Sequence, residues 1–220
     1  LDRVYGVAFD GTGDRVASAA GDGTIKVWSL TRKNAVTLKG HKGRVNAVSF
    51  APSGQRLFSG GEDRTVRVWD LVRKSNRVLR GHTDGVLAVA SGPSRELVAS
   101  AGEDGTVRVW NLKSDAVRIL RGHRGEVTAL AFDPLGRWVA SGSTDRTIRL
   151  WQLSSGQSRV LGTHDARVSS LGFSGSGDLL ASGGYDRTLR LWDLRTKPPR
   201  SASGGPCPAL GSPPCPPPTS

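Results

Sequence analysis

The chain contains no methionine and only two cysteines, and aromatic residues make up 6% of it. No apolar run approaches the roughly 18 residues that a membrane-spanning helix needs. Cys207 and Cys215 stand among prolines, and their spacing differs from the paired CxxC pattern of zinc sites. So little cysteine argues against a disulfide framework and favours a reducing compartment, so we expect a cytoplasmic location, or a nuclear one in a eukaryotic cell. Because the chain starts at Leu1 and lacks methionine, we also expect a fragment or a processed piece.

Against these scarcities stands one strong regularity, an interval of 41 residues. Tryptophan recurs at this interval as Trp28, Trp69, Trp110, Trp151 and Trp192. Serine and aspartate recur with it, and every histidine of the chain obeys it. Self-similarity at a fixed period predicts a repeat protein, in which each unit is one supersecondary element that stacks on its neighbours.

Each period also contains four short runs that are typical of strands. In residues 40–80, runs rich in Val, Leu, Thr and Trp lie at 44–50, 55–59, 65–69 and 78–79, with turn-forming residues between them. No stretch shows 3.6-residue amphipathic periodicity over the length of a helix. The sequence therefore predicts an all-β chain with four strands per unit.

Two dipeptides recur at fixed places in these units: Gly-His before the first strand and Trp-Asp at the end of the third. The copies are Gly40-His41 with Trp69-Asp70, Gly81-His82 with Trp110, Gly122-His123 with Trp151, and His164 with Trp192-Asp193. In this pattern the chain resembles the WD-repeat β-propeller family over residues 1–194. The resemblance implies about five four-stranded blades, at 1–39, 40–80, 81–121, 122–162 and 163–194. A Pro/Gly/Ser-rich tail at 195–220 follows, and we expect it to be disordered.

Both ends of the repeat region look incomplete. The chain begins just after the place of its first Gly-His, and residues 199–202 lack the apolar pair expected of a fourth strand in the last unit. Propellers of this family are closed rings, commonly of seven blades, so five units would not close one. An open arc would expose two blade faces and a strand edge. We therefore predict a partial propeller, a piece of a longer one, with a distorted five-blade closure or self-association as the alternatives.

The recurring His, Ser and Asp invite a hydrolase interpretation, in which histidine activates serine and aspartate orients the imidazole. A catalytic set is needed once per site, whereas this set recurs, which favours a structural role. Tryptophan N–H can donate to serine, serine O–H to histidine and histidine N–H to aspartate, so every polar group can be satisfied. The resemblance implies that the groups form structural tetrads. The sets are His41, Ser59, Asp63 and Trp69; His82, Ser100, Asp104 and Trp110; His123, Ser141, Asp145 and Trp151; and His164, Ser182, Asp186 and Trp192.

Other signs of chemistry are weak. The sequence contains no GxSxG, GxxxxGK[ST] or HExxH motif. Asp-Gly pairs such as Asp104-Gly105 are tight-turn signals between strands and lack the glutamate of a calcium loop. We predict no enzymatic activity, no catalytic residue, no metal and no cofactor.

The chain carries a formal net charge of +12, most of it from arginine. Arginine favours carboxylate and phosphate partners. One arginine recurs at the same position in each of four units: Arg67, Arg108, Arg149 and Arg190. We interpret this position as solvated and on the outer part of the unit. Since no pattern of stacking aromatic residues accompanies the charge, a nucleic-acid interface is the alternative rather than the first choice.

Specificity is expected where the repeats differ at one structural address. Two loops per unit differ in this way: the loop after each histidine, and the turn before the third strand. The resemblance implies that both open on one face of the propeller. The candidate partner-binding residues are Lys42, Arg44, Glu62, Arg64, Asp84, Glu103, Arg124, Glu126, Arg146, Arg167, Tyr185 and Arg187. Tyr185 is the aromatic anchor candidate, with packing on a neighbouring blade as its alternative.

These features predict a noncatalytic scaffold that binds a protein or peptide partner in a larger complex or a multidomain signalling protein. The alternative is a subunit associated with RNA or ribonucleoprotein through its arginines. No membrane and no small-molecule substrate are expected. We interpret Trp138 as packing between blades, with exposure to a partner as the alternative. We interpret the PxxP spacing at 213–216 as a by-product of a proline-rich linker, with a polyproline ligand for an SH3-type module as the alternative.

Overall fold

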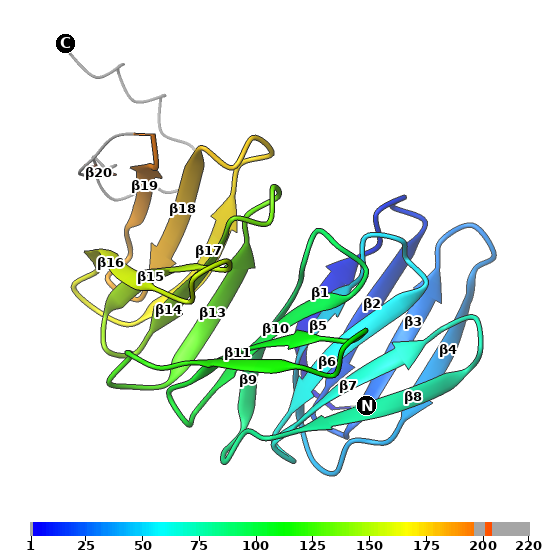
Figure 1. Ribbon diagram of the computed structural model, residues 1–220. Coiled ribbons are helices and arrows are strands. Elements are labelled where there is room, and N and C mark those ends of the chain that lie inside the picture. Colours follow the sequence, from blue (N-terminus) through cyan, green and yellow to red (C-terminus); the bar gives the residue numbers. More distant parts are fainter. Residues whose placement is uncertain (1, 196–200, 204–220) are drawn as a thin grey trace.

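The computed structural model describes residues 2–195 and 201–203, and the regular elements in this part of the chain are all strands. They form five antiparallel sheets of four strands each, and each sheet follows the order of the sequence (Figure 1). The all-β prediction is therefore confirmed. No helix within these residues is long and apolar enough to cross a membrane.

The strands have the following bounds. The first sheet contains β1 (Val4–Phe9), β2 (Arg15–Ala20), β3 (Thr24–Ser29) and β4 (Asn34–Lys39). The second contains β5 (Val45–Phe50), β6 (Arg56–Gly61), β7 (Thr65–Asp70) and β8 (Ser75–Arg80). The third contains β9 (Val86–Ser91), β10 (Leu97–Gly102), β11 (Val107–Asn111) and β12 (Val117–Leu120). The fourth contains β13 (Val127–Phe132), β14 (Trp138–Ser143), β15 (Thr147–Gln152) and β16 (Ser158–Thr163). The fifth contains β17 (Val168–Phe173), β18 (Leu179–Gly184), β19 (Leu189–Asp193) and β20 (Ser201–Ser203).

The first hairpin of each sheet repeats one irregularity. Where β5 pairs with β6, Val45 faces Gly61 and Ala47 faces Gly60, so one extra residue stands on β5. The same shift occurs at the start of β1, β9, β13 and β17. Such a β-bulge bends the strand and increases its twist. The bulge recurs with the sequence period, as expected if each unit folds in the same way.

The hydrophobic core lies between successive sheets, not inside any one of them. Four clusters of buried side chains each join residues of two neighbouring sheets. In the first cluster, Trp69 and Leu57 of the second sheet pack with Ala17 and Ile25 of the first. Burying apolar surface contributes about 25 cal/mol for each Å². Each sheet is therefore stabilised mainly by its neighbours.

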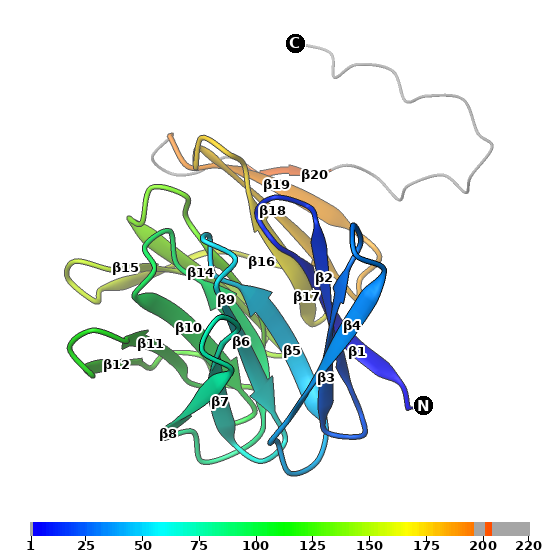
Figure 2. The same ribbon diagram turned by 90° about the vertical axis from the view of Figure 1, so that its right-hand side faces the viewer.

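The sheets are arranged as an open arc with one strand of each toward the inside. The innermost strands β1, β5, β9, β13 and β17 contact one another in sequence order, and the sheets fan outward from them (Figure 1 and Figure 2). The first sheet has no preceding neighbour among the described residues. As a result Val7 is 68% exposed, whereas Val48, at the same address in the second sheet, is 8% exposed. This is a partial propeller with an uncovered apolar face.

The fifth sheet differs from what the sequence predicted. The last unit was expected to lack its fourth strand, but β20 pairs with β19, placing Ser203 opposite Arg190 and Ser201 opposite Trp192. Strand pairing uses backbone groups, so three residues without an apolar pair can still extend a sheet. The predicted tail at 195–220, apart from Arg195 and 201–203, lies outside the described residues, and so do both cysteines and the PxxP spacing.

Candidate functional site

The structure brings each predicted His, Ser, Asp and Trp set together. In the fourth sheet, Trp151 Nε1 donates to Ser141 Oγ at 2.7 Å, and that oxygen lies 2.7 Å from His123 Nε2. His123 Nδ1 lies 2.9 Å from a carboxylate oxygen of Asp145. The corresponding distances in the other three sets are 2.7 to 2.9 Å. These sets are His41, Ser59, Asp63 and Trp69; His82, Ser100, Asp104 and Trp110; and His164, Ser182, Asp186 and Trp192.

The donor and acceptor roles in these sets follow from chemistry. Indole N–H can only donate and an ionised carboxylate can only accept, so Nδ1 of each imidazole must carry the proton. Nε2 of the neutral imidazole carries no proton and accepts a hydrogen bond from the serine hydroxyl. Burial lowers the pKa of His41, His82 and His123 and outweighs the opposing effect of the neighbouring aspartates. The neutral imidazole is therefore the form that completes the hydrogen-bond series from tryptophan to aspartate.

Each aspartate of a set collects several further donors. Asp145 accepts the backbone N–H groups of Arg124 and Thr147 at 2.9 and 2.8 Å, and the Thr147 hydroxyl at 2.7 Å. Burial raises the pKa of this carboxyl, but the hydrogen bonds outweigh burial and hold it well below its usual range. The pKa values of Asp63 and Asp104 are lowered for the same reasons. The aspartate thus joins the loop after the histidine to the turn before the third strand.

The threonine in this network is a residue that the sequence analysis missed. It recurs at the same interval as the tryptophans, so the signal was present: Thr24, Thr65, Thr106, Thr147 and Thr188. In each sheet its hydroxyl donates to the turn aspartate at 2.6 to 2.8 Å. Threonine at this address closes the turn, and it does so even in the first sheet, which has no histidine.

The recurring arginines do not occupy the solvated address that the sequence predicted. Arg108 is 6% exposed, and its guanidinium is buried enough that burial lowers its pKa. The guanidinium of Arg67 lies 5.7 Å from the centre of the Trp69 ring. The error arose because periodicity shows that an address repeats but not which way its side chain points.

This arginine also explains the glycine of each Gly-His step. A Cβ atom at Gly40 would lie 2.6 Å from Arg67 Nη1 and 3.0 Å from Trp69. A Cβ at Gly122 would meet Arg149 at 3.0 Å. The backbone before the histidine therefore passes too close to the Arg and Trp pair for a side chain to fit without movement. Before His164 the glycine is replaced by Thr163, the last residue of β16, and Arg190 of the fifth sheet donates to the Thr163 carbonyl.

The twelve candidate partner-binding residues lie on the two loops that the tetrads join. All are exposed except the half-buried Arg44. The two loops of a unit are bonded to each other through the backbone: Glu62 N–H donates to the Arg44 carbonyl at 2.8 Å, and Tyr185 N–H to the Arg167 carbonyl at 2.9 Å. We call this surface the loop face. It consists of Lys42, Arg44, Glu62, Arg64, Asp84, Glu103, Arg124, Glu126, Arg146, Arg167, Tyr185 and Arg187.

Tyr185 takes part in a specific arrangement on the loop face. Its side chain is exposed, and the Arg167 guanidinium lies 3.7 Å from the centre of its ring. This is a cation–π contact between the two loops of the unit. No sheet follows the fifth one within the described residues, so the alternative of a partly buried tyrosine that packs on the next blade stays a prediction. Trp138, in contrast, is half-buried and packs against the cluster between the fourth and fifth sheets.

The charges of the loop face are not evenly mixed. Burial and the nearby Asp84 raise the pKa of Glu103, with a smaller contribution from Glu126, so acidic groups crowd around the third sheet. Arginines dominate the loop face at the fourth and fifth sheets: Arg124, Arg146, Arg167 and Arg187.

Three arginines of the loop face, namely Arg64, Arg146 and Arg187, have positive φ angles of 62°, 72° and 64°. Glycine holds the same address in the other two units, at Gly23 and Gly105.

Comparison with known families agrees with this geometry. The family model described as WD domain, G-beta repeat, matches five consecutive stretches: residues 1–29, 32–70, 73–111, 114–152 and 155–193. No curated protein matches the chain. The matched stretches are offset from the sheets, since 32–70 contains β4 of the first sheet and β5 to β7 of the second. Each matched repeat after the first thus supplies the outer strand of the preceding sheet, which links neighbouring sheets covalently. With its tetrads and its five matched repeats, the chain belongs to the WD-repeat family.

Proposed function

We propose that the chain is a noncatalytic scaffold that binds a protein or peptide partner through its loop face. WD repeats are generally protein-interaction scaffolds. The observation that carries the proposal is the state of the serine hydroxyls. Ser59, Ser100 and Ser141 are fully buried, Ser182 is 1% exposed, and each of these oxygens is bonded to both a tryptophan and a histidine. A nucleophile must reach its substrate, and these hydroxyls are enclosed.

The loop face supplies what the tetrads do not: exposed, chemically varied side chains on a rigid support. Tyr185 stacked with Arg167 has the amphipathic character common among residues that dominate binding energy. The acidic groups around Asp84 and the arginines of the last two sheets would set the orientation of a partner of complementary charge. A location in the cytoplasm, or the nucleus of a eukaryotic cell, is part of the proposal and is supported by the scarcity of cysteine.

The test begins with a phage-displayed peptide library selected on the purified chain. The affinity of the selected peptides is then measured for Tyr185→Ala and Arg167→Ala. We expect each substitution to weaken binding at least tenfold, because truncating an anchor removes about 2 kcal/mol or more. The exposed Leu135, between β13 and β14, gives the matched control, Leu135→Ala, which should bind as the wild type does. Peptides whose binding ignores every loop-face substitution would refute the proposal.

A second candidate, binding of RNA through arginine, has one observation in its favour: the basic cluster on the fourth and fifth sheets. Its weakness is that the recurring arginines Arg67, Arg108, Arg149 and Arg190 are partly or fully buried, and Arg67 and Arg149 lie over tryptophan rings, so they cannot all reach phosphate. The measurement is the affinity for a single-stranded RNA oligonucleotide as a function of salt. A steep loss of affinity with salt would support this candidate, and Arg146→Glu should then abolish binding.

A further inference from the structure

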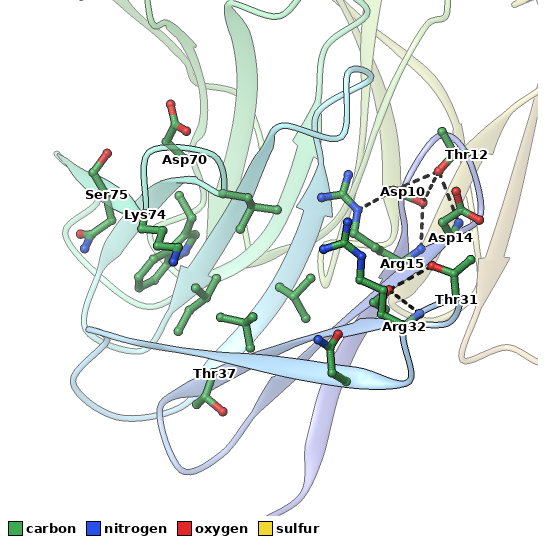
Figure 3. A pocket seen from close by; sticks show the side chains of 18 of the residues that line it. Asp10, Thr12, Asp14, Arg15, Thr31, Arg32, Thr37, Asp70, Lys74 and Ser75 are labelled. Carbon is green, nitrogen blue, oxygen red and sulfur yellow. Dashed lines mark hydrogen bonds and ion pairs between the residues drawn. The ribbon is translucent and has the colours of Figure 1, made fainter.

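A cleft of about 820 Å³ lies between the outer parts of the first and second sheets (Figure 3). Its floor is apolar and contains Val27, Val36, Leu38, Trp69 and Leu71. The corresponding space between the second and third sheets is divided into two smaller pockets of about 170 and 270 Å³. We call the larger one the sheet 1–2 cleft. It is separate from the loop face, since none of its lining residues is a loop-face residue.

One side chain explains the difference in size. Val36 of β4 has the same address as Arg77 of β8 and Arg118 of β12, one and two periods later. Arg77 crosses to the third sheet, where it donates to the Leu112 carbonyl at 3.4 Å and to Asp115 at 2.6 Å. Arg118 crosses in the same way to the Leu153 carbonyl of the fourth sheet. Val36 is too short to cross, and its side chain is 59% exposed.

The short valine leaves an acceptor unused. Leu71 stands where Leu112 and Leu153 stand in the later sheets, and within the described residues no group donates to its carbonyl. Lys74 holds the address of Asp115, so the acidic partner of the missing guanidinium is replaced by a cation. The cleft therefore has an apolar floor, a free backbone acceptor, and a lysine at the position where the next junction has an aspartate.

The charges that face the cleft favour an anion. Arg32, Lys39 and Lys74 line it, and Figure 3 shows the Arg32 guanidinium and Lys74 on opposite sides of the floor. Arg15 is already engaged, because it donates to Asp10 at 2.8 Å and to the Gly54 carbonyl at 2.6 Å.

The acidic side chains of the lining are engaged or remote. Asp10 is bonded to Arg15. The carboxylate of Asp70 accepts backbone N–H groups of Val72 and Arg73, and Figure 3 shows it at the outer end of the cleft, with Asp14 at the opposite end. Arg32, Lys39 and Lys74 thus outnumber the two carboxylates that Arg15 does not neutralise, Asp14 and Asp70, so the lining keeps a net positive charge around its apolar floor.

We propose that the sheet 1–2 cleft binds an extended acidic peptide segment. An apolar side chain of the peptide packs on Val36, Leu38 and Leu71, and a peptide N–H donates to the Leu71 carbonyl. The flanking carboxylates face Arg32, Lys39 and Lys74. The occupant thus supplies the hydrogen bond and the packing that Arg77 and Arg118 supply within the chain at the next two junctions.

The probe is a fluorescein-labelled pentapeptide, Glu-Glu-Leu-Glu-Glu, whose binding to the whole 220-residue chain is followed by fluorescence polarisation. Val36→Arg should weaken binding at least fivefold, because the new side chain fills the cleft as Arg77 does. This substitution adds positive charge, so a merely electrostatic association would become tighter instead. Val160→Arg adds the same charge on the exposed part of β16 and should leave affinity within twofold of the wild type.

Two further arms identify the contacts. Lys74→Asp should weaken binding at least fivefold, and the local backbone accepts it, since Lys74 and Asp115 have φ angles of 53° and 59°. A peptide with serine in place of leucine should bind at least fivefold more weakly, and one with lysine in place of glutamate should not bind. The proposal is overturned if the wild type does not bind the probe, or if Val36→Arg binds it equally well or better. Loss of binding in Tyr185→Ala would place the peptide on the loop face, and would overturn this proposal while leaving the function proposed above intact.

Discussion

The first and fourth sheets have the same strand order, yet their tryptophans stand in different environments. Trp151 is 2% exposed and donates to Ser141 at 2.7 Å, whereas Trp28 is 43% exposed and lies 3.3 Å from Ser18. The fourth sheet has a histidine in its set and a preceding sheet to pack on. The first sheet has neither within the described residues.

The turn half of the network is the same in both sheets. Asp22 accepts the N–H and the hydroxyl of Thr24 at 3.0 and 2.6 Å, as Asp145 does with Thr147. The turn therefore forms without histidine, while the tryptophan half becomes tight only when histidine and a preceding sheet enclose it. The difference teaches that the tetrad ties together one unit, and that its tryptophan is enclosed only where a preceding sheet packs against it. In a low dielectric, a fully paired network stabilises the fold, and a half-paired one is costly.

The largest loss of stability is expected from His123→Ala, which removes the histidine that distinguishes the fourth sheet from the first. The substitution leaves the Ser141 hydroxyl and the Asp145 carboxylate without their buried partner, which costs about 3 kcal/mol of unfolding free energy. Urea denaturation measures it. The matched change in the first sheet is Ser18→Ala, where water can replace the lost partner, and its cost should be about 0.5 kcal/mol. Unchanged stability in His123→Ala, together with loss of an esterase activity, would show that the set is catalytic.

The next largest effect concerns the two tryptophans themselves. Trp151→Phe removes the indole N–H from an enclosed site and leaves a small cavity, so we expect a loss of about 2 kcal/mol. Trp28→Phe should cost about 0.5 kcal/mol or less, because Trp28 is partly exposed and its hydrogen bond is long. Thermal unfolding of both variants gives the two values. Equal losses would mean that the junction with a preceding sheet does not determine the strength of the network.

The pH dependence of stability separates the same two regions. Burial lowers the folded pKa of His41, His82 and His123 below the unfolded value of 6.5, so the unfolded state binds protons first as the pH falls. The stability that these groups contribute is complete above pH 6.5 and is lost as the pH falls toward their folded pKa values. The lowered pKa values of the aspartates add a second loss below 3.8.

Melting temperatures between pH 8 and pH 5 measure the first of these losses. His123→Ala should show a smaller decrease than the wild type over this range, since it has one fewer buried imidazole. The first sheet contains no histidine and should not contribute. A melting temperature that rises as the pH falls would contradict the protonation states assigned to the tetrads.

The comparison also shows how far the sequence could predict the molecule. The 41-residue period predicted the sheets and pointed to the tetrad residues, because positions that are equivalent in the repeats occupy equivalent places in the sheets. It did not predict that Arg67 turns inward against Trp69, since periodicity carries no direction. It did not predict β20, whose pairing depends on the backbone. The sheet 1–2 cleft depends on Val36, Lys74 and Leu71 together, and their proximity becomes evident only once the sheets are placed side by side.

The smallest expected effect tests the loop face against the scaffold beneath it. Arg146 has a φ of 72° at an address where Gly105 has 69°, so its backbone is strained for a residue with a side chain. Arg146→Gly relieves roughly 1 kcal/mol of strain. The greater freedom of glycine in the unfolded chain offsets part of this, leaving a stabilisation of about 0.5 kcal/mol. Gly105→Arg is the reciprocal change and should destabilise by a similar amount. If urea denaturation shows that Arg146→Gly stabilises and Gly105→Arg destabilises, the arginines at this position do not stabilise the fold. Their role must then be sought in what the loop face binds.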